Sequence, residues 1–158
     1  VYILGDFSLR SEPKGWSLQA PAALRPGSWK EQGLPLYGHE MAYRKEFSAN
    51  ANHGYAVKLD NWKGTVATVK VNGKEAGIID IPPYTLDISD QVKPGNNTVE
   101  VVVTGSLKNT LGPHHNSPDP GLVSPWLWRK VKGYPSGNAY DCYDYGLLSD
   151  FSIMNYNK

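Results

Sequence analysis

Apolar and polar residues alternate along the middle of the chain, and this alternation predicts β-strands. The stretches YAVKLDNW (55–62) and NTVEVVVTG (97–105) show it most clearly, with apolar side chains at alternate positions. Successive side chains of a strand point to opposite faces, so this spacing gives each strand one face that can be buried. Residues 40–47 and 84–88 follow the same pattern, and residues 147–156 are predicted as a final strand.

Turn signals between these strands favour antiparallel pairing. In ATVKVNGKEAGI (67–78), Asn72-Gly73 suits the positive φ angles of a two-residue hairpin turn. Residues 87–96, DISDQVKPGN, predict a short helical turn followed by a Pro-Gly turn. Because no long helical segment separates the strands, the chain is predicted to be all-β, an antiparallel β-sandwich of the jelly-roll type.

Two long, proline-rich segments interrupt the succession of strands, at residues 8–38 and 106–141. Loops of this length are uncommon in compact domains and are usually functional or held down by packing. The second segment contains LGPHHN (111–116), with two adjacent histidines, and Ser124-Pro125, which favours the start of a short helical turn. We therefore expect any binding residues to lie in these two loops.

Size and charge restrict the class of protein. The chain has 158 residues, which fits a single domain, and its formal net charge is +1. That balance argues against a nucleic-acid partner, and no apolar stretch is long enough for a membrane span. One cysteine, Cys142, excludes an intrachain disulfide. The sequence opens without methionine inside an apparent strand, so we expect residues 1–158 to be one domain cut from a larger multidomain protein.

The order of motifs in the middle of the chain is more specific than any one of them. AYRKEF is followed by YAVKLDNWKGTVATVKVNGKEAG and then by PPYTLDISDQVKPGNNTVEVVV. This order resembles the sugar-binding jelly-roll domain of glycoside hydrolase family 2 and the related galactose-binding-like domains. The resemblance implies a galactose-binding-like sandwich. It implies no catalytic residue here, because family 2 enzymes carry their catalytic carboxylates on a separate barrel domain.

The flanking stretches GSWKEQGLPLYGHEMAYRKEF, GSLKNTLGPHH and YDYGLLSDF are similar to the C-terminal domain of large bacterial glycoside hydrolases akin to α-L-rhamnosidases. This similarity implies a periplasmic or extracellular parent enzyme that degrades polysaccharides. The chain would be its non-catalytic ancillary module, with the catalytic domain of the same parent as partner and carbohydrate as a ligand still to be tested. The alternatives are a purely structural interdomain module without ligand and, further off, a small independent glycoside hydrolase.

Carbohydrate recognition needs aromatic faces that stack on pyranose rings, together with planar polar groups that reach the hydroxyls. Both long segments supply such side chains. The predicted carbohydrate-binding residues are Trp126, Trp128, Tyr134, His114, His115, Tyr37 and Trp29. The competing interpretation is that these large side chains hold the loops onto the sandwich or dock onto a neighbouring domain, because apolar faces of this size are normally buried.

Metal and catalytic roles find little support in the sequence. A zinc site usually needs three or four convergent ligands, so the adjacent His114 and His115 predict no metal site. A structural calcium held by loop oxygens leaves little trace in a sequence and stays open, and no other cofactor is implied. A glycosidase needs two carboxylates that face each other across a cleft. Glu40 and Asp60 are the best candidates, although turns and solvated strand faces give such residues ordinary roles.

Overall fold

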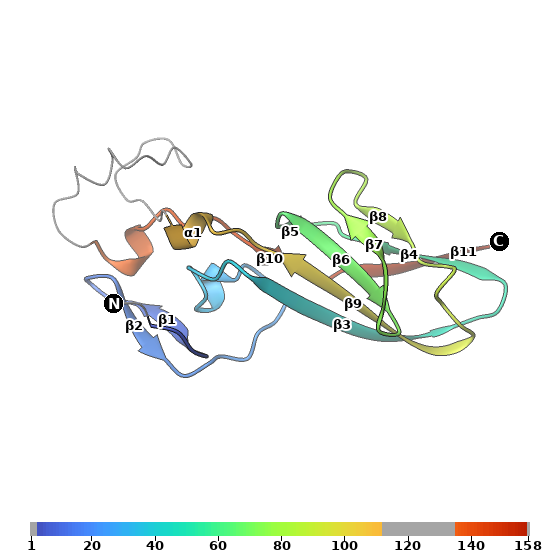
Figure 1. The fold of residues 1–158 in the computed structure, drawn as a ribbon, viewed down its shortest axis with the longest axis horizontal. Helices are drawn as coiled ribbons and strands as arrows, with labels where there is room; N and C mark the ends of the chain where they lie inside the picture. The colour runs from blue at the N-terminus through green and yellow to red at the C-terminus, as the bar shows by residue number, and fades with distance from the viewer. Residues whose placement is uncertain (1–2, 112–134, 158) are drawn as a thin grey trace. The chain divides into compact units, whose positions relative to one another are not determined.

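The computed structural model describes residues 3–111 and 135–157 of the chain. Most of its regular structure is short antiparallel strands (Figure 1). Backbone contacts divide the chain into two compact units. Unit 1 comprises Val1–Gly38 and Leu107–Asp144, and unit 2 comprises His39–Ser106 and Tyr145–Lys158. The expectation that residues 1–158 fold as a single domain stays a prediction.

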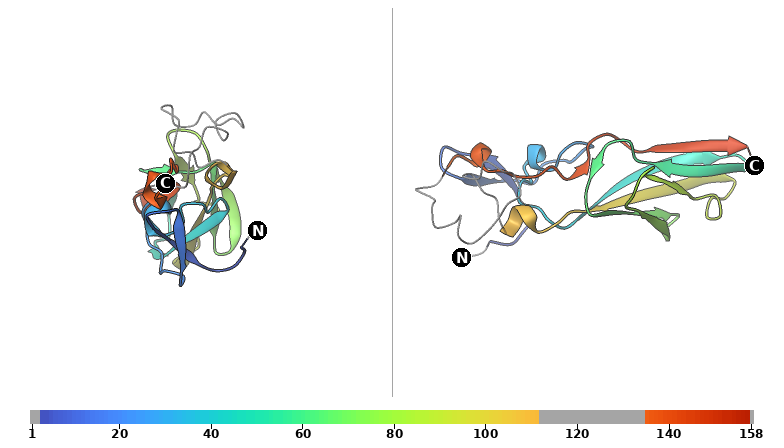
Figure 2. Two further views of the ribbon diagram at one scale, coloured as in Figure 1. Left: turned by 90° about the vertical axis from the view of Figure 1, so that its left-hand side faces the viewer. Right: turned by 90° about the horizontal axis from the view of Figure 1, so that it is seen from above.

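Unit 2 is built from two main sheets of antiparallel strands and one short strand pair. The larger sheet contains, in spatial order, β3 (Glu40–Ala49), β9 (Gly95–Thr104), β6 (Val66–Val71) and β7 (Lys74–Ile79). The second sheet contains β11 (Ser152–Asn157), β4 (His53–Lys58) and β8 (Thr85–Asp87). Figure 2 shows β11, in red, running alongside β4. The short pair is β10 (Gly146–Leu147) with β5 (Trp62–Lys63).

The two main sheets of unit 2 bury the faces that the alternation predicts. In β9, Val99, Val101 and Val103 are each 0% exposed. Burying a side chain of this size contributes about 1.5–3 kcal/mol relative to leaving it in water. The two sheets are in contact through the Phe47 ring of β3 and the Tyr55 ring of β4, whose centroids lie 5.3 Å apart. These features confirm the predicted all-β sandwich.

The turns of unit 2 largely follow the sequence signals. Asn72 and Gly73 adopt φ angles of 52° and 81°, as the hairpin between β6 and β7 requires. The predicted helical turn after β8 is instead a hydrogen-bonded turn without a helix. The Ser89 N–H donates to Oδ1 of Asp87 (2.8 Å), and the Gln91 N–H donates to the Ile88 carbonyl (3.0 Å). The turn is too short for the i→i−4 bonds of an α-helix.

Unit 1 contains short elements that the sequence did not predict. The segment predicted as the first long loop carries a hairpin of β1 (Ser8–Ser11) and β2 (Trp16–Gln19), followed by the 3-10 turn η1 (Lys30–Gln32). The strands SLRS and WSLQ are four residues long and lack β-branched residues, so they give little strand signal. The described ends of the second loop hold α1 (Lys108–Leu111) and η2 (Gly137–Ala139). The predicted turn at Ser124-Pro125 lies outside the described residues.

A buried asparagine holds α1 to the chain that follows η2, within unit 1. Asn109, in α1, is 2% exposed. Its Nδ2 donates to the Tyr143 carbonyl (2.9 Å), and its Oδ1 accepts the Tyr143 N–H (2.8 Å). The neighbouring Thr110 hydroxyl donates to the Leu36 carbonyl (2.7 Å).

Within the described ranges, no helix is both long enough and apolar enough to cross a membrane.

Candidate functional site

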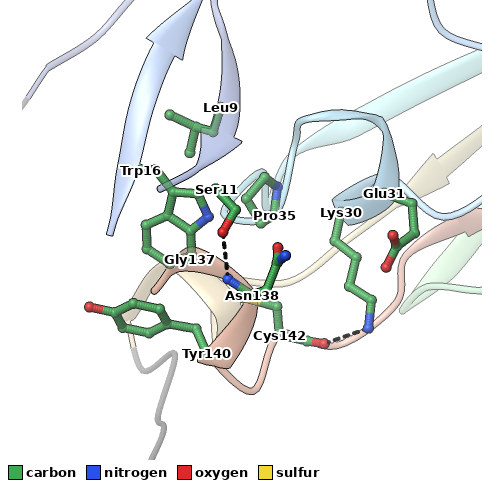
Figure 3. A pocket seen from close by; sticks show the side chains of 10 residues that line it. All are labelled: Leu9, Ser11, Trp16, Lys30, Glu31, Pro35, Gly137, Asn138, Tyr140 and Cys142. Atoms are coloured by element: carbon green, nitrogen blue, oxygen red, sulfur yellow. Dashed lines mark hydrogen bonds between the residues drawn. The ribbon is translucent and has the colours of Figure 1, made fainter. Parts of the chain in front are cut away.

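A pocket of about 240 Å³ lies within unit 1. Three segments line it: the β1–β2 hairpin, the turn that contains η1, and the segment that contains η2 (Figure 3). The first two belong to the first long segment of the sequence, and the third belongs to the second. The pocket is therefore a place where these two segments meet.

Backbone hydrogen bonds hold the η2 segment against the turn of the β1–β2 hairpin. Gly15 has φ 74°, and its N–H donates to the Pro135 carbonyl (2.6 Å). The Gly137 N–H donates to the Glu12 carbonyl (3.1 Å). A Cβ at Gly137 would lie 2.5 Å from Nε1 of Trp16 and 2.7 Å from the Gly15 carbonyl oxygen. Glycine at position 137 therefore allows the Trp16 indole to lie close against this backbone.

One wall of the pocket is aromatic. The rings of Trp16 and Tyr140 stack with their centroids 4.3 Å apart and their planes inclined at 30°. Such pairs contribute about 0.5–1.5 kcal/mol beyond the area that they bury. Both residues are only half-buried, so each keeps some exposed surface. The pair combines a fixed position with an accessible aromatic surface.

The opposite wall comes from η1, which a buried tryptophan anchors. Trp29 is 1% exposed, and its carbonyl accepts the Leu34 N–H (2.9 Å). The turn ends at Gly33, whose left-handed φ of 83° suits glycine. In Figure 3 the side chains of Lys30 and Glu31 stand across the pocket from the aromatic pair.

The two charged residues of this wall differ in their surroundings. Nζ of Lys30 donates to the Cys142 carbonyl (3.1 Å) and lies 3.3 Å from Oδ1 of Asp144. The Ser28 hydroxyl donates to the same carboxylate oxygen (2.7 Å), which fixes the position of the counter-charge. Glu31 is exposed and makes no ion pair within the described residues. The charge of Lys30 is thus compensated, whereas that of Glu31 is not.

Neither thiol nor metal chemistry is indicated at the pocket. Burial raises the pKa of the Cys142 thiol, and the nearby Lys30 ammonium only partly opposes this effect. The thiol is therefore protonated at neutral pH, which suits a structural cysteine better than a nucleophile. Within residues 3–111 and 135–157, no cluster of three or more histidine, cysteine and carboxylate side chains could hold a metal ion.

Two of the predicted carbohydrate-binding residues, Trp29 and Tyr37, lie in the described part of the chain. Their rings meet edge to face with centroids 5.5 Å apart. Since Trp29 is 1% exposed, its indole packs inside unit 1 and presents no face to a ligand. The other predicted residues lie outside the described ranges, and a binding role for them stays a prediction: His114, His115, Trp126, Trp128 and Tyr134.

None of the residues that line the pocket is among the predicted carbohydrate-binding residues, and Trp29 and Tyr37 do not line it. Ser11 and Asn138 are short polar residues in a segment without strand rhythm, and such residues are common in any loop. Tyr140 is one of ten tyrosines in the chain. The sequence shows only that each long segment contains aromatic residues. The folded chain shows that Trp16 and Tyr140 are in contact.

Comparison with known proteins agrees with the sandwich fold. No model of a known protein family matches the sequence. A curated protein named "Putative beta-glucuronidase", from Formosa agariphila, is 29% identical over 92 residues, which are 53% of this chain and 8% of that protein. A rhamnosidase from Novosphingobium sp. PP1Y has a TM-score of 0.58 at 17% identity, over 99% of this chain and 16% of the rhamnosidase. A β-glucuronidase from Bifidobacterium dentium has a TM-score of 0.52 at 18% identity, over 97% of this chain and 29% of the enzyme.

These coverages are strongly asymmetric. Nearly the whole of this chain finds a counterpart in the two solved structures, but it spans less than a third of either one. It spans an even smaller part of the curated relative. The resemblance to glycoside hydrolases predicted from the sequence is confirmed at the level of fold. The chain has the fold of a β-sandwich segment that occurs within a much larger rhamnosidase and a larger β-glucuronidase.

Proposed function

We propose that this chain is a non-catalytic ancillary module of a larger glycoside hydrolase, in which it supports the catalytic domain and binds carbohydrate. The asymmetric coverage is the observation that supports the proposal. Almost all of the chain matches, yet it matches only 16% of the rhamnosidase and 29% of the β-glucuronidase. A segment of that share is the size of one module in such an enzyme. The parent would act outside the cytoplasm, on polysaccharide.

The acidic residues of the described ranges support a non-catalytic role. Hydrolysis of a glycosidic bond uses two carboxyl groups across a cleft, about 5–10 Å apart. The pocket of unit 1 is lined by one carboxylate, that of Glu31. The two catalytic candidates from the sequence have other contacts in unit 2: Asp60 pairs with Lys58 (2.6 Å), and Glu40 accepts the Thr104 hydroxyl (3.3 Å). Asp60 and Glu40 are therefore exposed residues with surface contacts that need no catalytic role.

A purely structural interdomain module is the second candidate. The burial of Trp29 favours it, because this predicted binding residue serves packing instead. Tyr37 meets Trp29 edge to face but is itself only half-buried, so its burial favours neither candidate. The two candidates differ in whether the chain has any ligand, and they agree that catalysis lies elsewhere.

The test is to compare hydrolysis by the 158-residue chain with hydrolysis by the product of the complete open reading frame that encodes it. A panel of nitrophenyl glycosides, including β-glucuronide and α-L-rhamnoside, serves as substrate. We expect the chain alone to be inactive and the complete product to be active. Hydrolysis by the chain alone would refute the proposal, as would a complete product that is inactive on every glycoside and polysaccharide tried.

A further inference from the structure

We propose that the pocket of unit 1 binds a single neutral sugar residue, with the stacked pair of Trp16 and Tyr140 as its apolar wall. This inference rests on the proposed function, because it names the site and the ligand class for the carbohydrate-binding part of that function. It places the site at residues that differ from the predicted ones.

The apolar wall suits the C–H-rich face of a pyranose. Leu9 and Pro35 join the aromatic pair in lining the pocket. A half-buried, stacked aromatic pair changes little when a ligand arrives, so little side-chain entropy is lost on binding. Because Gly137 brings the indole against the η2 backbone, the wall is fixed from behind as well.

Polar groups at the pocket are placed to reach sugar hydroxyls. The Ser11 hydroxyl oxygen accepts the backbone N–H of Asn138 (2.9 Å), which leaves its own O–H available for donation. The side-chain amide of Asn138 is exposed and makes no hydrogen bond within the described residues. In Figure 3 this amide lies between the aromatic wall and the wall of Lys30 and Glu31. One amide can serve two neighbouring hydroxyls, donating to one and accepting from the other.

The charge at the pocket selects against an acidic sugar. Lys30 is the cation of the lining, and Asp144 and the Cys142 carbonyl already occupy its ammonium group. Glu31 faces the same space without a counter-ion in the described residues. A uronate carboxylate would meet this uncompensated negative charge, whereas a neutral sugar can donate hydroxyl hydrogen bonds to it.

The volume limits the ligand to one ring. Pockets for drug-sized ligands measure roughly 300–1,000 Å³. At about 240 Å³ this pocket is smaller, which suits a monosaccharide or the terminal residue of a chain. A ligand of that size has a dissociation constant on the order of 1 mM. The site is therefore expected to contribute weak binding, of the kind that matters when a module is tethered to its enzyme.

Two-dimensional ¹H–¹⁵N NMR of the 158-residue chain tests the proposal. The probes are the methyl glycosides of glucose, galactose, mannose and rhamnose, each titrated to about 50 mM, well above the expected dissociation constant. Methyl β-D-glucuronide is the acidic comparison. We expect at least one neutral glycoside to shift the backbone amides of Ser11, Asn138 and Tyr140 with saturation. We expect the glucuronide to bind at least about tenfold more weakly, the factor expected for one unfavourable charge contact.

Substitutions at two exposed residues probe the pocket without removing its aromatic wall. Asn138→Ala should weaken binding of the neutral glycoside at least about fivefold, whereas Asn155→Ala, an exposed asparagine in β11 of unit 2, should leave it unchanged. Glu31→Gln should bring the glucuronide close to the neutral glycoside in affinity. Glu75→Gln, an exposed glutamate of β7, is its control and should preserve the difference.

Three results would overturn the proposal. They are saturating shifts that gather outside the pocket, equal affinity for the glucuronide and the neutral glycosides, or no shifts with any glycoside while the spectrum is that of a folded protein. None of them bears on where hydrolysis takes place. Failure of the sugar site is thereby distinguished from failure of the proposed function, which the comparison with the complete open reading frame decides.

Discussion

Replacing Asn109 by alanine should destabilise unit 1 by about 2–4 kcal/mol. The side chain is 2% exposed and makes both a donated and an accepted hydrogen bond with the backbone of Tyr143 (2.9 and 2.8 Å). Each such bond contributes about 0.5–1.5 kcal/mol net, and a buried group left without its partner costs about 1–3 kcal/mol. Both bonds go to the backbone of one residue, Tyr143, and are lost together, so their costs accumulate at a single place.

The pH dependence of the stability of Asn109→Asp distinguishes the contributions of the two hydrogen bonds. An ionised carboxylate still accepts the Tyr143 N–H but opposes the Tyr143 carbonyl oxygen, whereas a protonated carboxyl can restore both contacts. Burial and the carbonyl both raise the pKa of the introduced carboxyl above its unfolded value. The variant should therefore approach the wild-type stability below the unfolded pKa and lose this stability as the pH rises through the raised folded pKa.

Urea unfolding followed by tryptophan fluorescence measures this effect in a Trp62→Phe background. Trp62 is the one tryptophan in the sequence of unit 2, so the remaining signal reports on unit 1. The neighbouring Thr110→Val is the control, since it removes one exposed hydrogen bond (2.7 Å) and should cost about 1 kcal/mol or less. The two hydrogen bonds of Asn109 would not have the assigned role if Asn109→Ala cost no more than the control, or if Asn109→Asp showed the same pH dependence of stability as the parent.

Three further predictions concern other parts of the structure. The Ser17 hydroxyl is the main cause of the lowered pKa of Glu12, so Ser17→Ala should raise that pKa in an NMR titration. A group whose pKa is lowered by folding stabilises the folded chain at pH values above its unfolded pKa. The parent should therefore lose more stability than the variant as the pH falls through the folded pKa of Glu12. A Cβ at Gly54 would lie 2.2 Å from the Tyr156 ring, so Gly54→Ala should lower the stability of unit 2 by about 1–3 kcal/mol in calorimetry, and an additional Tyr156→Ala should remove most of that difference. Because burial raises the pKa of Cys142, iodoacetamide should alkylate it more slowly at pH 8 in the folded chain than in urea, and equal rates would contradict the assignment.

The sandwich could be predicted from the sequence because its signals are local. Alternating valines define β9, and Asn72-Gly73 defines a hairpin, whatever the rest of the chain does. The prediction of a helical turn after β8 was wrong because the segment is too short to form a helix, although it has a suitable capping residue. Asp87 does accept a hydrogen bond from the Ser89 N–H, as a capping residue would, but no helix follows.

The pocket could not be predicted, because its residues acquire their roles from partners far along the chain. Trp16 and Trp29 lie in the same proline-rich segment, and nothing local distinguishes them. Trp29 is 1% exposed and anchors the η1 turn. Trp16 stays half-exposed because its partner is Tyr140, and because Gly137 leaves room for the indole. The burial of each aromatic side chain is thus decided by long-range packing rather than by its neighbours in sequence.

The contrast between the two units has a physical reason. In unit 2, long ladders pair β3, β9 and β6 residue by residue, and the inward faces are filled with aliphatic side chains, which leaves little freedom to shape a concave site. In unit 1, the elements are three or four residues long, and single hydrogen bonds such as Gly137 N–H to Glu12 hold them together. Short elements leave polar groups and ring faces uncovered where three segments meet. A binding function is therefore expected in the irregular unit, while the regular sandwich supplies stability.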